Sequence, residues 1–335
     1  MLRSALVVLA IAGSAIVLSA APHQNPRTDT AIDGTVAVGV ACGDRTFVPL
    51  AARTKGRWAA LIEADERVSL QYFFGVLTPP ARRLPRQGWT LYPRGAGAPR
   101  PLVLRSRGTD SDPGQCLYTQ AFDSNAPPLP GRVACPGCTQ LLPQIGGIGV
   151  LGPARFESGD DVTAQPDEDS RRVASLIVRE VHVAERRLDR ETGEASPLRL
   201  FTGRKEVRSV VRLLSMIRHR IGDDEWYFFQ AQKRHGEWFV FEGKRMYKEW
   251  AVVLLHGWVR SSSTGIAALP ADASFVDDGL KTSRFYRLTG VLVIDERIVW
   301  ITEGFGFESQ WVELFEAAPA RQRPHSVLTV DTGGS

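Results

Sequence analysis

The chain has 335 residues, 43% of them hydrophobic, and its 41 Lys and Arg outnumber its 37 Asp and Glu to give a formal net charge of +4. This length is enough for two domains with a sizeable apolar core. The small positive excess is interleaved with acidic residues, as in AERRLDRETGE, so composition excludes a strongly basic protein and we expect no nucleic-acid partner.

The first 21 residues, MLRSALVVLAIAGSAIVLSAA, have the order of a secretory signal peptide. Arg3 precedes an apolar run over residues 5–18, and small residues follow at 19–21. The apolar run is shorter than the about 20 residues that a membrane-spanning helix needs, although an uncleaved anchor is the alternative. Residues 22–34 are polar and are predicted to be a linker. We therefore expect a soluble protein exported to the periplasm or the extracellular space, with no membrane span after signal removal.

Residues 35–155 are predicted to form a small β domain. Short runs of β-forming residues, such as VAVGVAC, TFVPLAAR and GWTLYP, alternate with turns, which is typical of a meander of antiparallel strands. Residues 124–153 are rich in Pro and Gly, so this end of the domain is predicted to be mostly irregular.

Residues 156–170 are acidic and predict a linker between the halves, and residues 171–317 then predict an α+β domain. Ser170 is the expected N-cap of one core-facing helix. Apolar residues follow at helical spacing, namely Val173, Leu176, Ile177, Val181 and Ala184. Residues 203–220 fit either helix or strand, and the later Val-, Ile-, Trp- and Phe-rich runs predict an antiparallel sheet. We expect a disordered tail over 318–335.

The predicted fold class is therefore α+β and β-rich: a small antiparallel β domain followed by an antiparallel sheet with at least one packed helix. Three segments resemble a loose group of uncharacterised exported bacterial proteins, namely GDRTFVPLAARTKGRWAAL, GWTLYPRGAGAPRPLVL and GVLVIDERIVWITEGFGFESQWVELFE. The resemblance spans most of the mature chain and rests on patterning. It implies export and this two-part architecture, and it implies no activity.

The four cysteines are an even set in a chain expected to be exported, which predicts two disulfides. We favour Cys42 with Cys116, and Cys135 with Cys138 across a Pro-Gly turn. The alternative ties Cys135 and Cys138 back to the other two. A thioredoxin-type site needs its first cysteine at a helix N-terminus, whereas TQLLPQIGG after Cys138 leaves room for one turn at most. A four-thiolate zinc site is disfavoured in an oxidising compartment.

Two motifs resemble catalytic or cofactor sites. VVLLHGW at 252–258 has the His-Gly of an α/β-hydrolase oxyanion strand, but the chain has no Gly-x-Ser-x-Gly elbow, and Ser261–Ser263 have no specified base. We interpret it as a core strand that ends at His256. GIGVLG at 147–152 matches a dinucleotide motif without a surrounding βαβ pattern, so it predicts a Gly-rich connection and no bound cofactor.

Acidic residues near the C-terminus are the remaining candidates, because a glycosidase needs two carboxylates on opposite sides of a sugar bond. Asp295 and Glu296 are predicted to form a hairpin turn. Glu303 and Glu308 lie among aromatic residues, which could stack on a sugar but are more typical of a core.

No catalytic, cofactor or metal set follows from these motifs. We therefore predict an exported, non-catalytic binding or interaction module of the periplasm or cell envelope, whose partner is an envelope polymer or another exported protein. The alternative is a secreted hydrolase of envelope or extracellular polymers. A third hypothesis is a thiol-disulfide protein that uses the CPGC motif.

Overall fold

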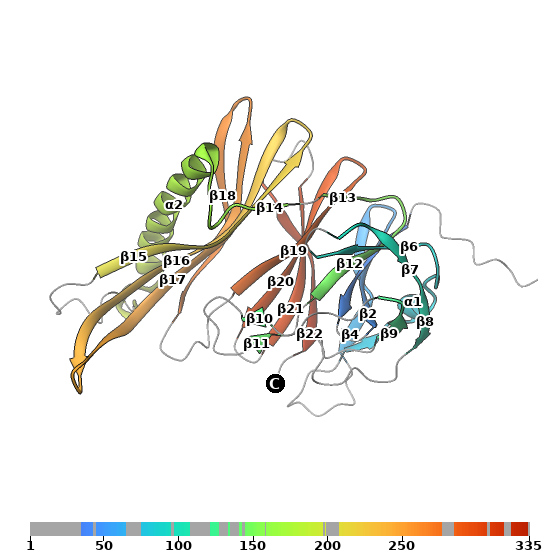
Figure 1. Cartoon of the computed structure of the whole chain (residues 1–335), viewed down its shortest axis with the longest axis horizontal. Helices are drawn as coiled ribbons and strands as arrows, with labels where there is room; N and C mark the ends of the chain where they lie inside the picture. The colour runs from blue at the N-terminus through green and yellow to red at the C-terminus, as the bar shows by residue number, and fades with distance from the viewer. Residues whose placement is uncertain are drawn as a thin grey trace, which may run out of the picture. The chain divides into compact units, whose positions relative to one another are not determined.

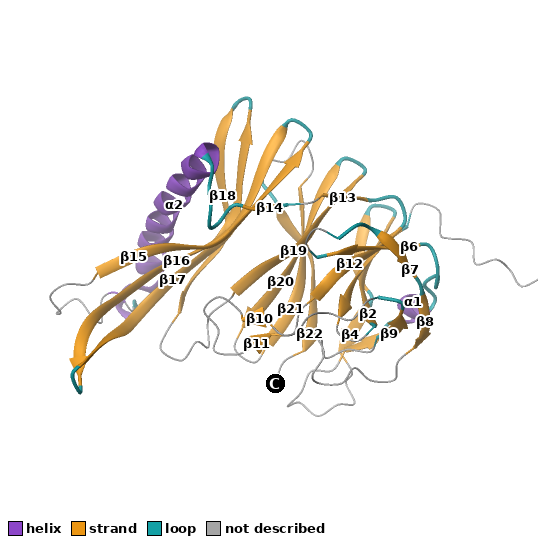
Figure 2. Ribbon diagram, in the orientation of Figure 1, coloured by secondary structure: helices purple, strands orange, loops and turns teal. Residues whose placement is uncertain are grey.

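The computed structural model describes residues 35–42, 45–64, 75–94, 97–107, 121–126, 133–134, 141–142, 145–157, 159–196, 198, 208–276, 285–306, 309–317 and 323–333. Most of them are strands in antiparallel sheets, and one long helix is present (Figures 1 and 2). The predicted β-rich α+β fold is confirmed. All described residues belong to one compact unit, Gly34–Ser335.

The first sheet contains the predicted meander. Its strand order is β7-β6-β12-β1-β2-β9-β8, with β3 paired to β2. The strands are β1 (Val36–Cys42), β2 (Thr46–Thr54), β3 (Arg57–Ala60), β6 (Trp89–Pro93), β7 (Arg100–Leu102), β8 (Leu104–Arg107), β9 (Phe122–Ser124) and β12 (Ile145–Leu151). Minor elements are α1 (Pro79–Arg82), the pair β4 (Ile62–Ala64) and β5 (Gly75–Leu77), and the pair β10 (Val133–Ala134) and β11 (Leu141–Leu142).

Strand β12 corrects the prediction of an irregular, Gly-rich connection. It pairs with β1 on one side and with β6 on the other, so the GIGVLG segment is an interior strand. The glycines are needed for packing: a Cβ on Gly149 would lie 2.3 Å from the ring of Phe47, and one on Gly39 would lie 2.5 Å from it. Gly39 and Gly149 face each other across the two strands. The paired glycines therefore leave room for the buried Phe47 ring.

The second sheet has the order β13-β19-β20-β21-β22. Its strands are β13 (Arg155–Glu157), β19 (Phe285–Ile294), β20 (Arg297–Gly306), β21 (Ser309–Ala317) and β22 (His325–Gly333). Strand β22 corrects the predicted disordered tail, because residues 325–333 pair along β21. Val330 and Thr332 are buried at alternate positions of β22, so the polar-looking tail has a core-facing side.

The third sheet has the order β14-β15-β16-β17-β18. Its strands are β14 (Asp160–Asp161), β15 (Arg208–Ile221), β16 (Asp224–Phe241), β17 (Lys244–Ser262) and β18 (Gly265–Val276). Residues 208–220, which fitted either helix or strand, are therefore strand. The segment 156–170, predicted to be a linker, contains β14 and part of β13.

Helix α2 (Glu168–Thr192) confirms the predicted core-facing helix, and Val173, Ile177 and Val181 are fully buried against the third sheet. The N-cap is Asp167 rather than Ser170: a carboxylate oxygen of Asp167 accepts the backbone N–H of Ser170 at 2.8 Å. The helix begins three residues earlier than its apolar stripe suggests because a capping side chain acts on the N–H groups of the first turn.

The sheets pack through four apolar clusters, the smallest of which contains Val252 and Leu254 with Leu214 and Phe285. One lies between α2 and the third sheet, and one joins the other face of the third sheet to the second sheet through Trp226, Trp258 and Trp300. The remaining cluster contains residues of the first sheet together with Leu292, Val299 and others from β19 to β22. The apolar core therefore continues across the segment predicted to separate two domains.

Candidate functional site

Cys42 is the one cysteine among the described residues. It ends β1, is 1% exposed and is not a free thiol. Cys116, Cys135 and Cys138 lie outside the described residues, so both the favoured pairing and its alternative stay predictions.

His256 lies inside β17 rather than at the end of a strand. It is 4% exposed, and its ring stacks on that of Tyr286 with centroids 3.7 Å apart. The strand continues to Ser262, so Ser261 is five residues further on, about 16 Å along the strand and on its opposite face. The structure does not bring His256 together with Ser261–Ser263. His256 therefore cannot act as a base for a nucleophilic serine in this segment.

The C-terminal carboxylates also lie apart. Asp295 and Glu296 form the two-residue turn between β19 and β20, with φ values of 47° and 62°, which confirms the predicted hairpin. Asp295 is exposed and pairs with Arg53 of β2 at 2.9 Å. Glu308 lies outside the described residues.

Glu303 is fully buried in β20. Its Oε2 accepts from Nε of Arg287 at 2.5 Å and from the Thr289 hydroxyl at 3.5 Å. Among the described residues, nothing bonds to its Oε1. A carboxylate that cleaves a sugar bond must reach its substrate, whereas this carboxylate is ion-paired inside the sheet. Neither Glu303 nor His256 therefore supports the hydrolase hypothesis.

A buried polar cluster lies between α2 and β16, and no sequence pattern predicted it. Glu185 is 9% exposed and contacts two basic side chains: its Oε2 lies 2.5 Å from Nζ of Lys233, and its Oε1 lies 2.5 Å from Nε2 of His235. Lys233 also bonds Nδ1 of His182 at 3.1 Å. Desolvation alone would raise the pKa of Glu185, but the bonds from His235 and Lys233 outweigh it and lower that pKa to about 2.

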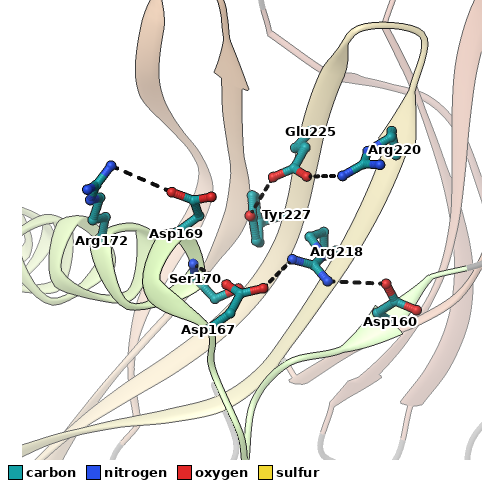
Figure 3. A network of polar contacts seen from close by, with 9 residues as sticks. All are labelled: Asp160, Asp167, Asp169, Ser170, Arg172, Arg218, Arg220, Glu225 and Tyr227. Carbon is teal, nitrogen blue, oxygen red and sulfur yellow. Dashed lines mark hydrogen bonds and ion pairs between the residues drawn. The ribbon is translucent and has the colours of Figure 1, made fainter.

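A second network fastens the N-terminus of α2 to the third sheet (Figure 3). Nη1 of Arg218 lies 2.5 Å from Oδ2 of Asp167, and Nη2 of Arg218 lies 3.4 Å from Asp160. The backbone N–H of Ser170, followed by Arg218, lowers the pKa of Asp167 to about 2. The same network raises the pKa of Arg218. These charged groups are hydrogen-bonded to one another, so the network has a structural role: it holds the N-terminus of α2 against the third sheet.

Beside it, Glu225 accepts from the Tyr227 hydroxyl and from Nη2 of Arg220, both at 2.9 Å (Figure 3). The bond from Arg220 is the main cause that lowers the pKa of Glu225. Burial, followed by the contact with Glu225, raises the pKa of Tyr227 to about 12. A tyrosine held in its protonated form is a hydrogen-bond donor and not a base. Tyr227 therefore has a structural role as the donor to Glu225.

Two neighbouring apolar side chains are exposed near the end of the β16–β17 hairpin of the third sheet, whose strands are labelled in Figure 1. Within the described residues, β15 pairs with β16 only as far as Gly236, and β18 pairs with β17 only from Val252 onward. In that part of the chain, residues 237–250, here called the ribbon, pair only with each other and, at Glu249, with Gly236. Val240 is 72% exposed and Phe241 is 57% exposed.

No group of three or more His, Cys, Asp or Glu side chains in the described ranges is arranged to hold a metal ion. Those ranges also contain no helix that is long and apolar enough to cross a membrane. Comparison of the chain with protein-family models, with curated proteins and with solved structures gives no match. Function is therefore argued from the residues and their geometry.

Proposed function

We propose that this protein is an exported, non-catalytic interaction module whose ribbon inserts into a cleft of another exported protein. Export is supported by the charged, apolar and small-residue order of residues 1–21. Two disulfides fit the same compartment, and the buried, non-free Cys42 supports them. The observation that carries the interaction role is the exposure of Val240 and Phe241 at the end of the ribbon.

The geometry of the ribbon indicates the shape of its partner. Val240 and Phe241 are neighbours in one strand, so their side chains leave opposite faces of the ribbon. A flat surface would cover one of them, whereas a cleft covers both. The ribbon carries three acidic residues, Glu237, Glu242 and Glu249, and three basic ones, Lys244, Arg245 and Lys248, so it has no net charge to attract an anionic polymer. Glu242 would also enter hydrocarbon first, which disfavours a bilayer. A protein cleft with apolar walls and a polar floor fits these features.

Burial of the two side chains supplies useful binding energy. Fully burying one Val or Phe is worth about 1.5–3 kcal/mol. Scaled by the exposed fractions of 72% and 57%, Val240 and Phe241 together contribute about 3 kcal/mol, or about a hundredfold in affinity. An isolated two-stranded ribbon is only marginally stable in water, so a partner that covers it also stabilises it.

A site-specific photo-crosslinker tests this proposal in the organism that makes the protein. The crosslinker is placed at position 240, at position 241, or at Glu296 in the turn of a different hairpin. We expect positions 240 and 241 to join the same exported protein and Glu296 not to join it. A Phe241→Asp change should remove the adduct at 240, while urea unfolding shows that the variant remains folded.

Other outcomes would overturn the proposal. If the crosslinker at Glu296 gives as much of the same adduct as the crosslinker at position 240, the partner does not contact the ribbon specifically. An adduct of twice the mass of the chain would identify a second copy as the occupant, and lipid-linked adducts would identify a membrane. A chain that accumulates in the cytoplasm with residues 1–21 intact would overturn the export part alone.

A further inference from the structure

The buried cluster between α2 and β16 has a proton-dependent bond at its edge. His182 and Glu185 lie one turn apart on the helix, and Lys233 and His235 alternate on β16, so each pair shares a face. Lys233, Glu185 and His235 are each less than 10% exposed, whereas the His182 side chain is 41% exposed. His182 is therefore the member of the cluster whose side chain water reaches.

The contact with Lys233 requires a neutral His182. A lysine ammonium donates hydrogen bonds and accepts none, so Nδ1 of His182, 3.1 Å from Nζ, must be the acceptor. The ring proton then lies on Nε2. If His182 gains a second proton, Nδ1 also becomes a donor and faces the ammonium, and the bond to Lys233 cannot persist.

The neighbouring elements offer little compensation for that added charge. On β15 and β17, the residues paired with Lys233 are Val211 and Val253, and those paired with His235 are Ser209 and Ala251; none of the four titrates. On β18 the single titratable residue, Asp272, is paired with His256 instead. On α2, the charged residues that share the face of His182 are Arg179, Glu185, Arg186 and Asp189, whereas Glu180, two positions away, lies on another face.

We propose that His182, Glu185 and Lys233 form a pH-sensitive clasp that holds the second half of α2 on the third sheet and opens when His182 is protonated. Nδ1 of His182 already lies 3.8 Å from Oε2 of Glu185, the oxygen that bonds Lys233. The imidazolium therefore competes with the ammonium for one carboxylate oxygen, while Oε1 is taken by His235. Repulsion between the two cations weakens the hold of β16 on the helix in the pH range where histidines titrate.

Hydrogen exchange of the full chain at pH 7.5 and pH 5.5, corrected for the intrinsic rates, tests the clasp. We expect amides of residues 182–192 to exchange about tenfold faster, relative to intrinsic rates, at the lower pH. His182→Gln keeps an acceptor for Lys233 but cannot gain a proton, so its protection should be the same at both values. His325→Gln in β22 is the matched control and should respond like the parent chain.

Two further readouts keep the proposal falsifiable if a variant folds poorly. His182→Lys mimics the protonated state and should show fast exchange already at pH 7.5. In the unmodified chain, nitrogen chemical shifts of His182 should report the Nε2–H form at pH 7.5. The clasp is refuted if His182→Gln retains the acid-induced loss of protection, if the parent shows none, or if the Nδ1–H form is found.

Discussion

Replacement of Glu185 should reveal how strongly the buried cluster depends on its one carboxylate. The side chains of Glu185 and Lys233 are 11% and 8% exposed, so water cannot replace a lost partner. Breaking a buried ion pair from one side costs about 3–5 kcal/mol. We expect Glu185→Met to lower the free energy of unfolding by about 3 kcal/mol, the lower end of that range, because some exposure remains.

The double-mutant cycle makes this expectation specific. Lys233→Met should cost a similar amount by itself, whereas the double Met variant should return to within about 1 kcal/mol of the parent because no unpaired charge is left buried. Urea unfolding at pH 8, followed by tryptophan fluorescence, measures all four chains. If each single change costs less than about 0.5 kcal/mol, as at exposed ion pairs, the cluster is solvated and our reasoning is wrong.

Two other substitutions test the fold, and a labelling experiment tests the predicted disulfides. Gly149→Ala forces a methyl group into the aromatic ring packed over it, and urea unfolding should show a loss of about 1–3 kcal/mol. Asp167 has a folded pKa of about 2, below the value of about 4 expected when unfolded, so its contribution is complete above pH 4 and is lost as the pH falls through 2. Asp167→Asn should therefore flatten the acid limb of a stability-against-pH curve, and an unchanged slope would contradict this. In protein purified from an oxidising host, a thiol reagent should label none of the four cysteines. Peptide mapping should show a disulfide between Cys135 and Cys138. If the reagent labels both of these cysteines, the thiol-disulfide hypothesis is favoured instead.

Periodicity in the sequence predicted the elements that bury one face. The apolar stripe of α2 from Val173 to Val181 identifies the helix because burial on one side imposes the helical period. Strands β1 and β2 are buried on both faces, and short runs of β-forming residues between turns identified them instead. Strand β12 was not predicted because its packing depends on Gly149, and local propensity assigns glycine to loops.

The buried cluster could not be predicted for a different reason. Glu185 and Lys233 are 48 residues apart in the chain, and each looks like a solvated charge in its own segment. Only the register of β16 and the rotation of α2 bring them together. Asp167 was missed as an N-cap for a more local reason, because three acidic residues and a serine in QPDEDS all compete for that position in the sequence.

The order in which the strands are synthesised has a consequence for how the chain matures. The first sheet is made early, but part of its apolar face packs against β19 to β22, which include the last strand of the chain. A nascent chain therefore carries an uncovered apolar surface until residues 325–333 have been made. Such a chain completes its apolar core only after residues 325–333 are available. Loss of the nine residues of β22 would thus remove a partner strand of β21 and uncover part of the core that the first and second sheets share.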